Sequence, residues 1–561
     1  MIDKLIFLFC ISNIILFISA TRHHHRDPLA TIRQGTLKGK FQQDKNGRNF
    51  SSFLGIPYAR PPIGELRFKN PEPGLTWSGI RQATEEANIC PQLEEENIKG
   101  NEDCLFINVH TPILEFNYPM DNKKLLPVMV WFHGGGFFWG NGNPSFLGPN
   151  FLPSRNVILV SLNYRLGILG FLTTGDSASP GNYGLKDQVL ALKWIQENIK
   201  NFGGDPNRVT IFGESSGGAS VQFLALSDKT HGLFHRYIIQ SGNVLGAWSF
   251  RKKENYQPYL DTVSKSVSCS NSNSEIFVNC LRNQSVEKLL KILIVKNEEY
   301  PLLYWLPTNE PESKDAFITD TPERLMAQNK MRDLPFIVGS TTDEGLFLSL
   351  LYYANLTSAS LNDAIKKAIT INGEYYFTKD KIPKFRKAVT DYYFSGSIDS
   401  LSRDELLKNY TRFLTDAGFF YPQIKFLEKM STYAQSSFYS YLFGYRGNNS
   451  YTNLIYKVKE NVGVMHSDEL LYLFSGIPMS WMTQDDEKIV NLMLDLWTSF
   501  AKNSIPKSHE ITNHHLWQPY KRCHAHLRIG DINNNKIPSV TLQREFYPDA
   551  MNFWRKTLPI L

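Results

Sequence analysis

The 561-residue chain has 42% hydrophobic and 20% charged residues and a formal net charge of +6. This composition is typical of a globular chain with a substantial core and excludes disordered and fibrous proteins. The basic residues are scattered without a long Lys/Arg run, which argues against a nucleic-acid partner. No internal period of about 20 to 50 residues repeats, so solenoids and propellers are also excluded.

The first segment, residues 1–20, has the features of a secretory signal peptide. An apolar stretch from Leu5 to Ile18 is followed by small residues that end at Ala20. The alternative, a membrane anchor or a buried helix, is less favoured because the stretch is short and interrupted. The C-terminal tail carries neither an ER-retention tetrapeptide nor a GPI signal. We expect a soluble, secreted, extracellular product without a membrane anchor, folded as a single domain over residues 21–561.

A histidine tract follows the signal at His23 to His25. Such a tract can bind a metal ion, but no second cluster of ligands accompanies it. We therefore interpret it as a solvated leader, and we expect no metal and no cofactor.

The cysteines outside the signal suggest local disulfides in an oxidising compartment. They are Cys90, Cys104, Cys269, Cys280 and Cys523. The spacing of the first two, and of the next two, suits two short bridges, with Cys523 left over. Four cysteines allow three pairings, so the connectivity stays open at this point.

Asn-x-Ser/Thr sequons fit a secreted surface, although such triplets also arise by chance. One of them, Asn49, could be buried. The sequons at which we expect glycosylation are Asn283, Asn355, Asn409 and Asn448.

Strand and helix patterns alternate along the chain. Residues 126–133, 156–165 and 208–213 contain continuous apolar runs, which fit strands buried on both faces. Between the second and third runs, residues 184–202 have apolar side chains at helical spacing, and Gly-Gly-Asp-Pro ends that helix. This order predicts an α/β fold with a large, mostly parallel sheet flanked by helices. Further strands are expected within residues 236–242, 334–341 and 438–446.

Ser215 lies in Gly-Glu-Ser-Ser-Gly, between an expected strand and an apolar helix. In this context Gly-x-Ser-x-Gly forms a nucleophile elbow, whereas the pentapeptide alone also occurs by chance. So sharp a reversal forces its central residue into a strained backbone conformation, and Gly213 and Gly217 leave room for the close approach. The serine oxygen would then stand above a helix N-terminus, whose dipole favours developing negative charge.

A nucleophile that attacks a carbonyl also needs donors for the oxyanion. The sequence Trp-Phe-His-Gly-Gly-Gly places a Gly-rich loop directly after a strand, so the N–H groups of Gly135 and Gly136 are candidates. The third donor would be the backbone N–H of Ser216. The alternative is a loop whose glycines only let it pass close to another backbone.

In folds built on such an elbow, an acid and then a histidine follow the serine along the chain. His466 follows a loop after the strand in 438–446, and we expect an amphipathic helix after it. His231 and His235 come too soon, and the histidines from His509 onward lie in polar, irregular sequence.

For the acid, Asp343 and Glu344 both end the strand in 334–341. The residues themselves do not decide between the two carboxylates, and both could be plain surface charges.

With these residues assembled, the chain resembles the type B carboxylesterase family, the cholinesterase-like α/β-hydrolases, across nearly its full length. The matching segments, in family order, are FLGIPYARPPIGELRF, EDCLFINVHTP, GGGFFWGNG, NYRLGILGFL, GNYGLKDQVLALKWIQENIKNFGGDP, VTIFGESSGGAS and GVMHSDELLYLF. The resemblance implies Ser215 as nucleophile, Glu344 as acid and His466 as base. It further implies an oxyanion hole from Gly135, Gly136 and Ser216, disulfides Cys90 with Cys104 and Cys269 with Cys280, and structural ion pairs Arg67 with Glu102 and Arg165 with Asp187.

Departures from the family pattern narrow the subfamily. The loop between Cys90 and Cys104 is short and has no tryptophan, so choline esters are doubtful substrates. Juvenile hormone esterases usually carry Gln before the nucleophile, where this chain has Glu214. Adhesion relatives have lost the triad, but each member is present here. The chain is most like the secreted carboxylesterases of insects.

The resemblance therefore predicts a secreted serine carboxylesterase that hydrolyses small-molecule esters through an acyl-enzyme. The alternatives are a juvenile hormone esterase, a slow-turnover sequestering esterase, a lipase and, disfavoured by the triad, an adhesion ectodomain. The oligomeric state is open.

Overall fold

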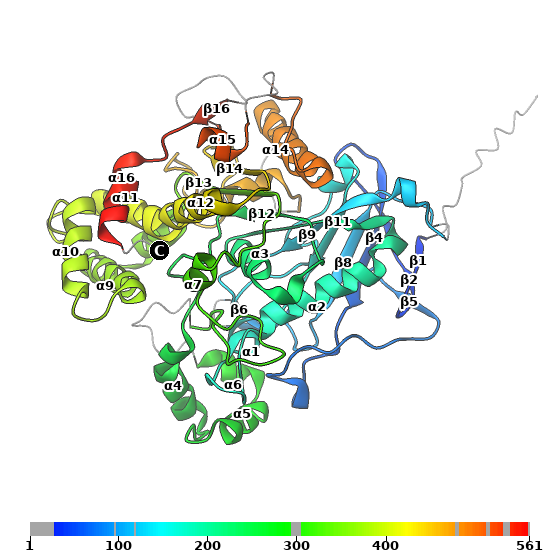
Figure 1. Ribbon diagram of the computed structural model, residues 1–561, viewed down its shortest axis with the longest axis horizontal. Helices are drawn as coiled ribbons and strands as arrows, with labels where there is room; N and C mark the ends of the chain where they lie inside the picture. Colours follow the sequence, from blue (N-terminus) through cyan, green and yellow to red (C-terminus); the bar gives the residue numbers. More distant parts are fainter. Residues whose placement is uncertain are drawn as a thin grey trace, which may run out of the picture.

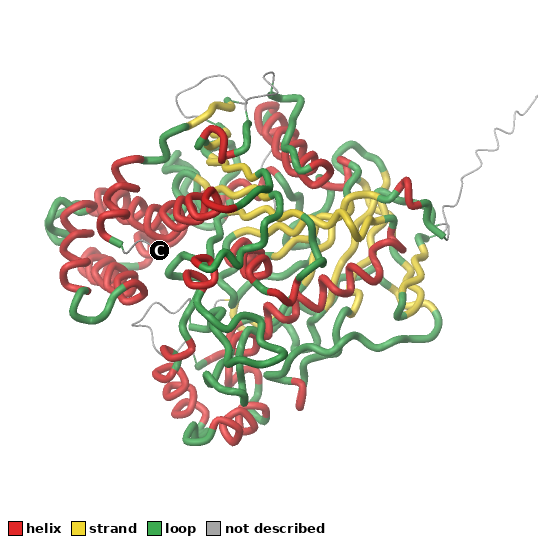
Figure 2. Tube along the Cα trace, in the orientation of Figure 1, coloured by secondary structure: helices red, strands yellow, loops and turns green. Residues whose placement is uncertain are grey.

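The computed structural model describes residues 27–94, 97–116, 119–292, 304–476, 482–511, 517–530 and 539–558. The predicted signal peptide at 1–20 and the histidine tract lie outside these residues. Figures 1 and 2 show a central sheet with helices packed on its two faces.

The central sheet has eleven strands in the order β16-β15-β14-β13-β12-β11-β9-β10-β8-β4-β3. The strands from β10 through β15 in this order pair in parallel. Antiparallel strands close both edges. The predicted α/β class with a mostly parallel sheet is confirmed. The strands are β3 (Lys40–Gln43), β4 (Asn49–Pro57), β8 (Phe106–Thr111), β9 (Leu126–Phe132), β10 (Ile158–Leu162), β11 (Gly204–Glu214), β12 (Arg236–Gln240), β13 (Phe336–Thr341), β14 (Phe438–Phe443), β15 (His526–Ile529) and β16 (Val540–Gln543).

Two small sheets lie outside the central one. One contains β1 (Leu29–Ile32), β2 (Gly35–Lys38) and β5 (Ile80–Gln82), and Figure 1 shows it at the edge of the molecule beside β4 and β8. The other is the hairpin of β6 (Gln92–Glu94) and β7 (Asn97–Lys99).

The central strands are apolar throughout because both faces of the sheet are covered. Successive side chains of β9 alternate between two cores: Val128 and Val130 belong to one, and Met129 and Trp131 to the other. The first core contains apolar side chains of α2 and α3, and the second contains those of α14. The helices are α1 (Gly167–Phe171), α2 (Tyr183–Asn198), α3 (Ser216–Leu226), α4 (Gln257–Val267), α5 (Ser274–Arg282), α6 (Val286–Lys291), α7 (Pro322–Ala327), α8 (Leu346–Asn355), α9 (Ser358–Tyr376), α10 (Ile382–Tyr393), α11 (Arg403–Thr415), α12 (Tyr421–Tyr433), α13 (Tyr451–Leu454), α14 (Gln484–Asn503), α15 (Tyr520–Cys523) and α16 (Pro548–Thr557).

The helix predicted between the second and third apolar runs is α2, extended by a 3-10 turn over Ile199–Phe202. It ends at Gly203, whose φ of 83° supplies the left-handed cap that the Gly-Gly-Asp-Pro pattern predicts. The helix expected after His466 is different: only a 3-10 turn forms, over Asp468–Tyr472. Both Asp468 and Glu469 in this turn are buried, so its polar positions do not form a solvent face.

Helices α9, α10, α11 and α16 gather on one side of the molecule, away from β1, β2 and β5 (Figure 1). We call α8 to α11 the helical lobe. A π-helical turn over Asp416–Phe420 joins α11 to α12. Such turns disturb regular helical hydrogen bonding and are frequent at functional sites.

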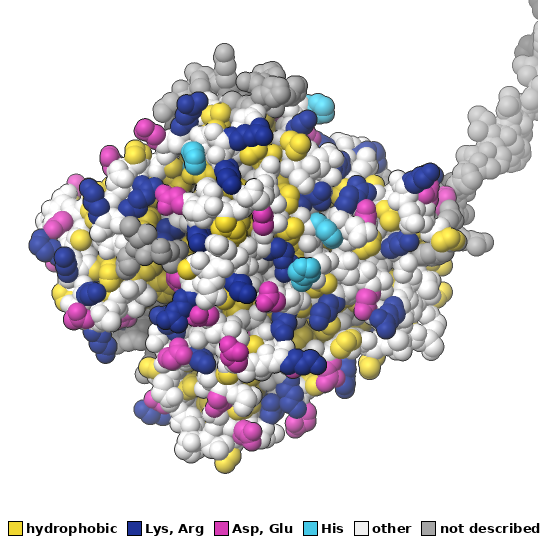
Figure 3. All heavy atoms as spheres, in the orientation of Figure 1, with side chains coloured by type: hydrophobic (Ala, Val, Ile, Leu, Met, Phe, Trp, Pro, Cys, Tyr) yellow, Lys and Arg dark blue, Asp and Glu magenta, His cyan; other side chains and the backbone are white. Residues whose placement is uncertain are grey.

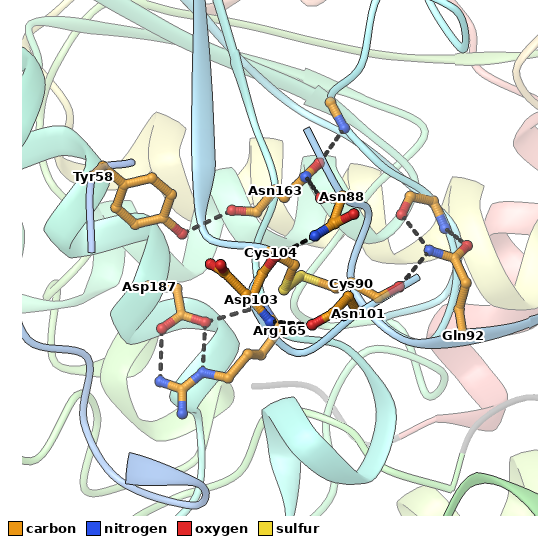
Figure 4. Close-up of a disulfide and its surroundings, with 12 residues drawn as sticks. Tyr58, Asn88, Cys90, Gln92, Asn101, Asp103, Cys104, Asn163, Arg165 and Asp187 are labelled. Atoms are coloured by element: carbon orange, nitrogen blue, oxygen red, sulfur yellow. Dashed lines mark hydrogen bonds and ion pairs between the residues drawn. A yellow bond between two sulfur atoms is a disulfide. The ribbon is translucent and has the colours of Figure 1, made fainter. Parts of the chain in front are cut away.

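Both predicted disulfides are formed. Cys90 is bonded to Cys104 and Cys269 to Cys280, while Cys523 is free and half-buried. Figure 4 shows the first bridge beside the ion pair of Arg165 with Asp187.

Charged side chains of both signs are interspersed on the face shown in Figure 3. Asn283, Asn355 and Asn448 are exposed and Asn409 is half-buried, and their glycosylation stays a prediction. Asn49, on β4, is also exposed, so the expectation that it could be buried is wrong. Among the described helices, none is both long and apolar enough to cross a membrane.

Candidate active site

Ser215 stands at a sharp bend between β11 and α3. Its φ of 58° and ψ of −124° lie outside the regions that non-glycine residues favour, as a nucleophile elbow requires. A Cβ on Gly217 would approach the Phe132 carbonyl oxygen to 2.0 Å, and one on Gly213 would come within 2.6 Å of Gly217. Larger residues at these two positions would therefore push α3 off the sheet.

The Gly-rich loop after β9 turns beside the elbow. Gly135 and Gly136 have φ values of 100° and 61°, and a Cβ on Gly135 would lie 2.1 Å from the Trp139 carbonyl oxygen. Among the described residues, none accepts a hydrogen bond from the backbone N–H of Gly135, Gly136 or Ser216. These three donors remain free to bind a ligand oxygen.

His466 is oriented by Glu344. The Nδ1 atom of His466 lies 2.6 Å from Oε2 of Glu344, which is fully buried in the turn after β13. The other oxygen, Oε1, accepts hydrogen bonds from the Ser241 hydroxyl (2.6 Å) and the Thr341 N–H (2.8 Å). These bonds fix the carboxylate and hence the imidazole ring.

Asp343, the other candidate acid, turns away from the imidazole. Its Oδ2 accepts hydrogen bonds from the Val464 N–H (3.0 Å) and the Thr342 hydroxyl (2.8 Å). It therefore supports the backbone that carries His466. The choice that the residues left open between these two neighbours comes down to the direction of each side chain.

The other ring nitrogen of His466 faces Glu214, the residue before the candidate nucleophile. Nε2 lies 3.1 Å from Oε1 of Glu214, which also accepts the Ser467 hydroxyl at 2.5 Å. No hydrogen bond joins Ser215 to His466 in the described part of the chain. Both side chains line the same cavity, and catalytic hydrogen bonds are often long or poorly aligned before substrate binds.

A third carboxylate, Glu469, is buried in the turn after His466. Its Oε1 accepts a hydrogen bond from Gln240 (3.2 Å), which in turn accepts one from the Trp497 indole (3.0 Å), but its Oε2 has no partner. Sequence reasoning missed Glu214 and Glu469 as parts of the site. The only signal in the sequence was that Glu214 directly precedes Ser215 and that Glu469 follows shortly after His466.

The three carboxylates change the ionisation of His466. Burial alone lowers its pKa, but the charges of Glu214 and Glu344 outweigh this and raise the pKa to about 9. Burial raises the pKa of Glu214 although the His466 charge opposes the shift, and burial with the charges of its neighbours raises the pKa of Glu469 to about 8. The groups titrate together, and the shared effect favours the charged imidazolium.

The cavity at Ser215 has a volume of about 400 Å³ and is mainly apolar. The rings of Phe347 and Phe419 pack against the His466 ring, each with a centroid separation of 5.0 Å. Phe347 comes from α8 and Phe419 from the π-helical turn. Other apolar walls come from Trp131, Phe138, Trp139, Trp248, Leu348 and Leu414.

The sheet order, the strand-to-helix bend at Ser215 and the cavity beside it define an α/β-hydrolase. A crystal structure described as juvenile hormone esterase from Manduca sexta, with OTFP covalently attached, superposes with a TM-score of 0.83 and 26% identity. The match covers 95% of this chain and 99% of that one.

Sequence comparisons give the family. The pattern of the Carboxylesterase family matches residues 26–554. The chain is 35% identical to Esterase FE4 of Myzus persicae, covering 92% of this chain and 91% of that protein, and 34% identical to the juvenile hormone esterase of Tribolium castaneum, covering 94% and 93%. The chain belongs to the carboxylesterase family and is a carboxylic ester hydrolase, which confirms the resemblance.

Proposed function

We propose that the protein is a secreted serine carboxylesterase in which Ser215, His466 and Glu344 form the catalytic triad. The observation that supports this most is the 2.6 Å contact of Glu344 with His466, whose ring lines the same cavity as Ser215. The unpartnered N–H groups of Gly135, Gly136 and Ser216 support the oxyanion hole. All six residues occupy the positions that the family resemblance assigns to these roles.

The reaction takes place in two steps. Neutral His466 accepts the proton of Ser215 as the serine oxygen bonds to the ester carbonyl carbon, and Glu344 stabilises the imidazolium. The oxyanion of the tetrahedral intermediate accepts hydrogen bonds from the free N–H groups of Gly135, Gly136 and Ser216. The C–O bond to the alcohol breaks as His466 returns the proton to that oxygen. Water then attacks the acyl-enzyme by the same route and releases the acid and free Ser215.

Glu214 acts on the same ring. For His466 to reach Ser215, its Nε2 has to exchange the contact with Glu214 for one with the serine oxygen. The Glu214 charge stabilises the imidazolium formed in each step, but it also keeps the base protonated at lower pH. A protonated ring cannot take a proton from Ser215 or from water, so both acylation and deacylation are expected to slow as the pH falls below the pKa of His466.

The apolar cavity favours apolar, small-molecule esters. Juvenile hormone esterase activity is a second candidate because relatives from Tribolium castaneum and Manduca sexta carry that name. A panel of short and long acyl esters together with juvenile hormone distinguishes the two. A preference of less than about 10-fold in kcat/KM for the hormone over simple esters would count against the hormone as the dedicated substrate.

Covalent labelling tests the nucleophile. An organophosphate should inactivate the enzyme and add one group to Ser215, identified by mass spectrometry of the peptide. Labelling at another residue, or inactivation without labelling, would reject the triad. A chromogenic ester then measures the burst: a stoichiometric burst followed by a slow steady state identifies the sequestering alternative.

Secretion and the single-domain organisation are inferred from the sequence. We infer that a secreted product expressed in insect cells starts at or near residue 21 and loses mass on treatment with an N-glycosidase. A secreted product that still carries residues 1–20 would contradict the predicted cleavage of a signal peptide. A single cooperative unfolding transition is expected for one domain over residues 21–561.

A further inference from the structure

Helix α9 of the helical lobe forms a wall of the cavity. Ala368, Ile371 and Asn372 line it, at positions i, i+3 and i+4 that share one face of a helix. Ala368 and Ile371 are apolar, and the neighbouring walls of the cavity are mainly apolar as well. Asn372 places a carboxamide on this apolar surface.

The carboxamide of Asn372 has no hydrogen-bond partner among the described residues. Its Oδ1 is buried and accepts no hydrogen bond, and its amide nitrogen donates to none of the described residues. Asn372 as a whole is half-buried, but its Oδ1 atom is shielded from solvent. A shielded amide oxygen without a hydrogen bond loses its hydration and gains nothing in return. Its position on α9 is therefore unfavourable for folding alone, and each such group in a folded protein calls for an explanation.

Trp131 also lines the cavity, and its buried indole nitrogen has no partner among the described residues, but an indole can only donate, whereas an amide can donate and accept. Most of the other polar side chains of the cavity have evident roles. Glu214, His466 and Ser467 contact one another at the catalytic end. Tyr456 donates its hydroxyl to the Phe347 carbonyl at 2.6 Å. Tyr451 packs against the buried cluster that contains Met465, the residue before His466, which places its ring near the catalytic end as well.

Asn372 and Ser215 lie on different walls of the cavity. Ser215 stands at the bend between β11 and α3, whereas Asn372 belongs to α9 of the helical lobe, and Figure 1 shows α3 and α9 apart. An ester whose carbonyl is at Ser215 would extend through apolar surroundings before its far part meets the carboxamide.

We propose that Asn372 is a specificity-determining residue, which hydrogen-bonds an oxygen function at the far part of an otherwise apolar ester. This inference rests on the proposed esterase function and names its substrate class. Rotation about χ2 turns either the oxygen or the nitrogen of the amide toward the cavity, so a hydroxyl can donate to it and an ether or carbonyl oxygen can accept from it.

The test compares matched esters on two variants. The esters are chromogenic and have alkyl chains of several lengths. At each length, three esters differ only in the terminal group, which is methyl, hydroxyl or methoxy. Asn372→Leu replaces the amide by an apolar group of similar size, and Ile371→Val is the control on the same wall. The wild-type enzyme should prefer the oxygenated ester at one chain length.

In Asn372→Leu, kcat/KM for the preferred oxygenated ester should fall about 10-fold, with a change of less than about 2-fold for the methyl-terminated ester. Ile371→Val should change both esters of a pair equally. The Asn372→Leu protein should also unfold at the same or a higher temperature, because an unpartnered amide has been removed.

The inference is overturned if the wild-type enzyme prefers no oxygenated ester, or if Asn372→Leu leaves the ratio of kcat/KM between oxygenated and methyl-terminated esters unchanged. In either case, hydrolysis that depends on Ser215 would leave the esterase function standing. Absence of hydrolysis across the whole panel, with no acylation of Ser215, overturns both.

Discussion

Two buried ionic clusters of this protein differ in how their charges are matched. Arg165 and Asp187, beside the first disulfide, form a balanced pair (Figure 4). The carboxylate accepts hydrogen bonds from the Arg165 backbone N–H, Nε and Nη2 at 3.0, 2.8 and 2.7 Å, and Nη1 donates to the Lys69 carbonyl. At the candidate active site, one imidazole instead contacts two buried carboxyl groups, those of Glu214 and Glu344. The charge of a third buried carboxyl group, Glu469, also acts on it, and Glu469 keeps an oxygen without a partner.

The difference separates structure from chemistry. A buried pair whose charges and hydrogen bonds are balanced holds one geometry, and removing one partner leaves an unpaired charge. A cluster with surplus negative charge has perturbed pKa values and can take up or release a proton, which is what an acid–base site needs. We therefore expect substitutions in the first cluster to change stability and those in the second to change rate and pH dependence.

The largest effect is expected from Ser215→Ala. Loss of the nucleophile should reduce kcat by about 10⁶-fold, as in other triads, while the free energy of unfolding stays within about 0.5 kcal/mol. Single-turnover kinetics and urea unfolding measure the two quantities. Residual activity above about 1% of wild type would mean that another group attacks the ester.

Glu344→Gln is expected to have the next largest effect. The amide no longer stabilises the imidazolium and can hold the wrong tautomer, so kcat should fall by about 10⁴-fold. Asp343→Asn is the matched control, since that side chain bonds to backbone and a hydroxyl rather than to His466, and it should lose less than about 10-fold. Equal losses in the two variants would contradict the assignment of Glu344 as the acid.

Arg165→Met tests the balanced cluster. It leaves Asp187 buried and unpaired, so the free energy of unfolding should fall by about 3 to 5 kcal/mol, measured by urea denaturation, while kcat per folded molecule stays within about 2-fold. The control is Arg60→Met, which breaks an exposed ion pair with Glu72 and should cost less than about 1 kcal/mol. A loss of kcat in Arg165→Met without a loss of stability would mean that this pair serves the reaction and not the fold.

Glu214→Gln should give the smallest change, seen in the pH dependence. The charge of Glu214 raises the pKa of His466 toward its value of about 9, and only the neutral ring is a base. Removing that charge lowers the pKa, so the acid limb of the kcat/KM profile should move to lower pH. Glu65→Gln, at an 88% exposed side chain, should leave the profile in place. A wild-type midpoint at or below 6.5 would show that the carboxylates do not act on His466.

Much of the fold could be predicted because its signals are local. Continuous apolar runs indicate strands covered on both faces, and the helical spacing in 184–202 matches α2 and its terminal turn. The 3-10 turn after His466 was not predictable, because its polar residues are buried by distant segments. Likewise, the residues could not decide between Asp343 and Glu344, because adjacent carboxylates on one strand end are told apart only by the direction that each side chain takes in the fold.

The sequence by itself determined the elbow, the Gly-rich loop and the family, since backbone strain, glycine positions and periodicity are properties of contiguous residues. Tertiary structure alone decided which carboxylates surround His466 and that Asn372 faces the cavity without a partner. Burial and charge at these positions depend on segments more than 100 residues apart in the chain, such as Glu344 and His466, and only packing brings them into contact. The electrostatics of the site are therefore a property of the fold as a whole.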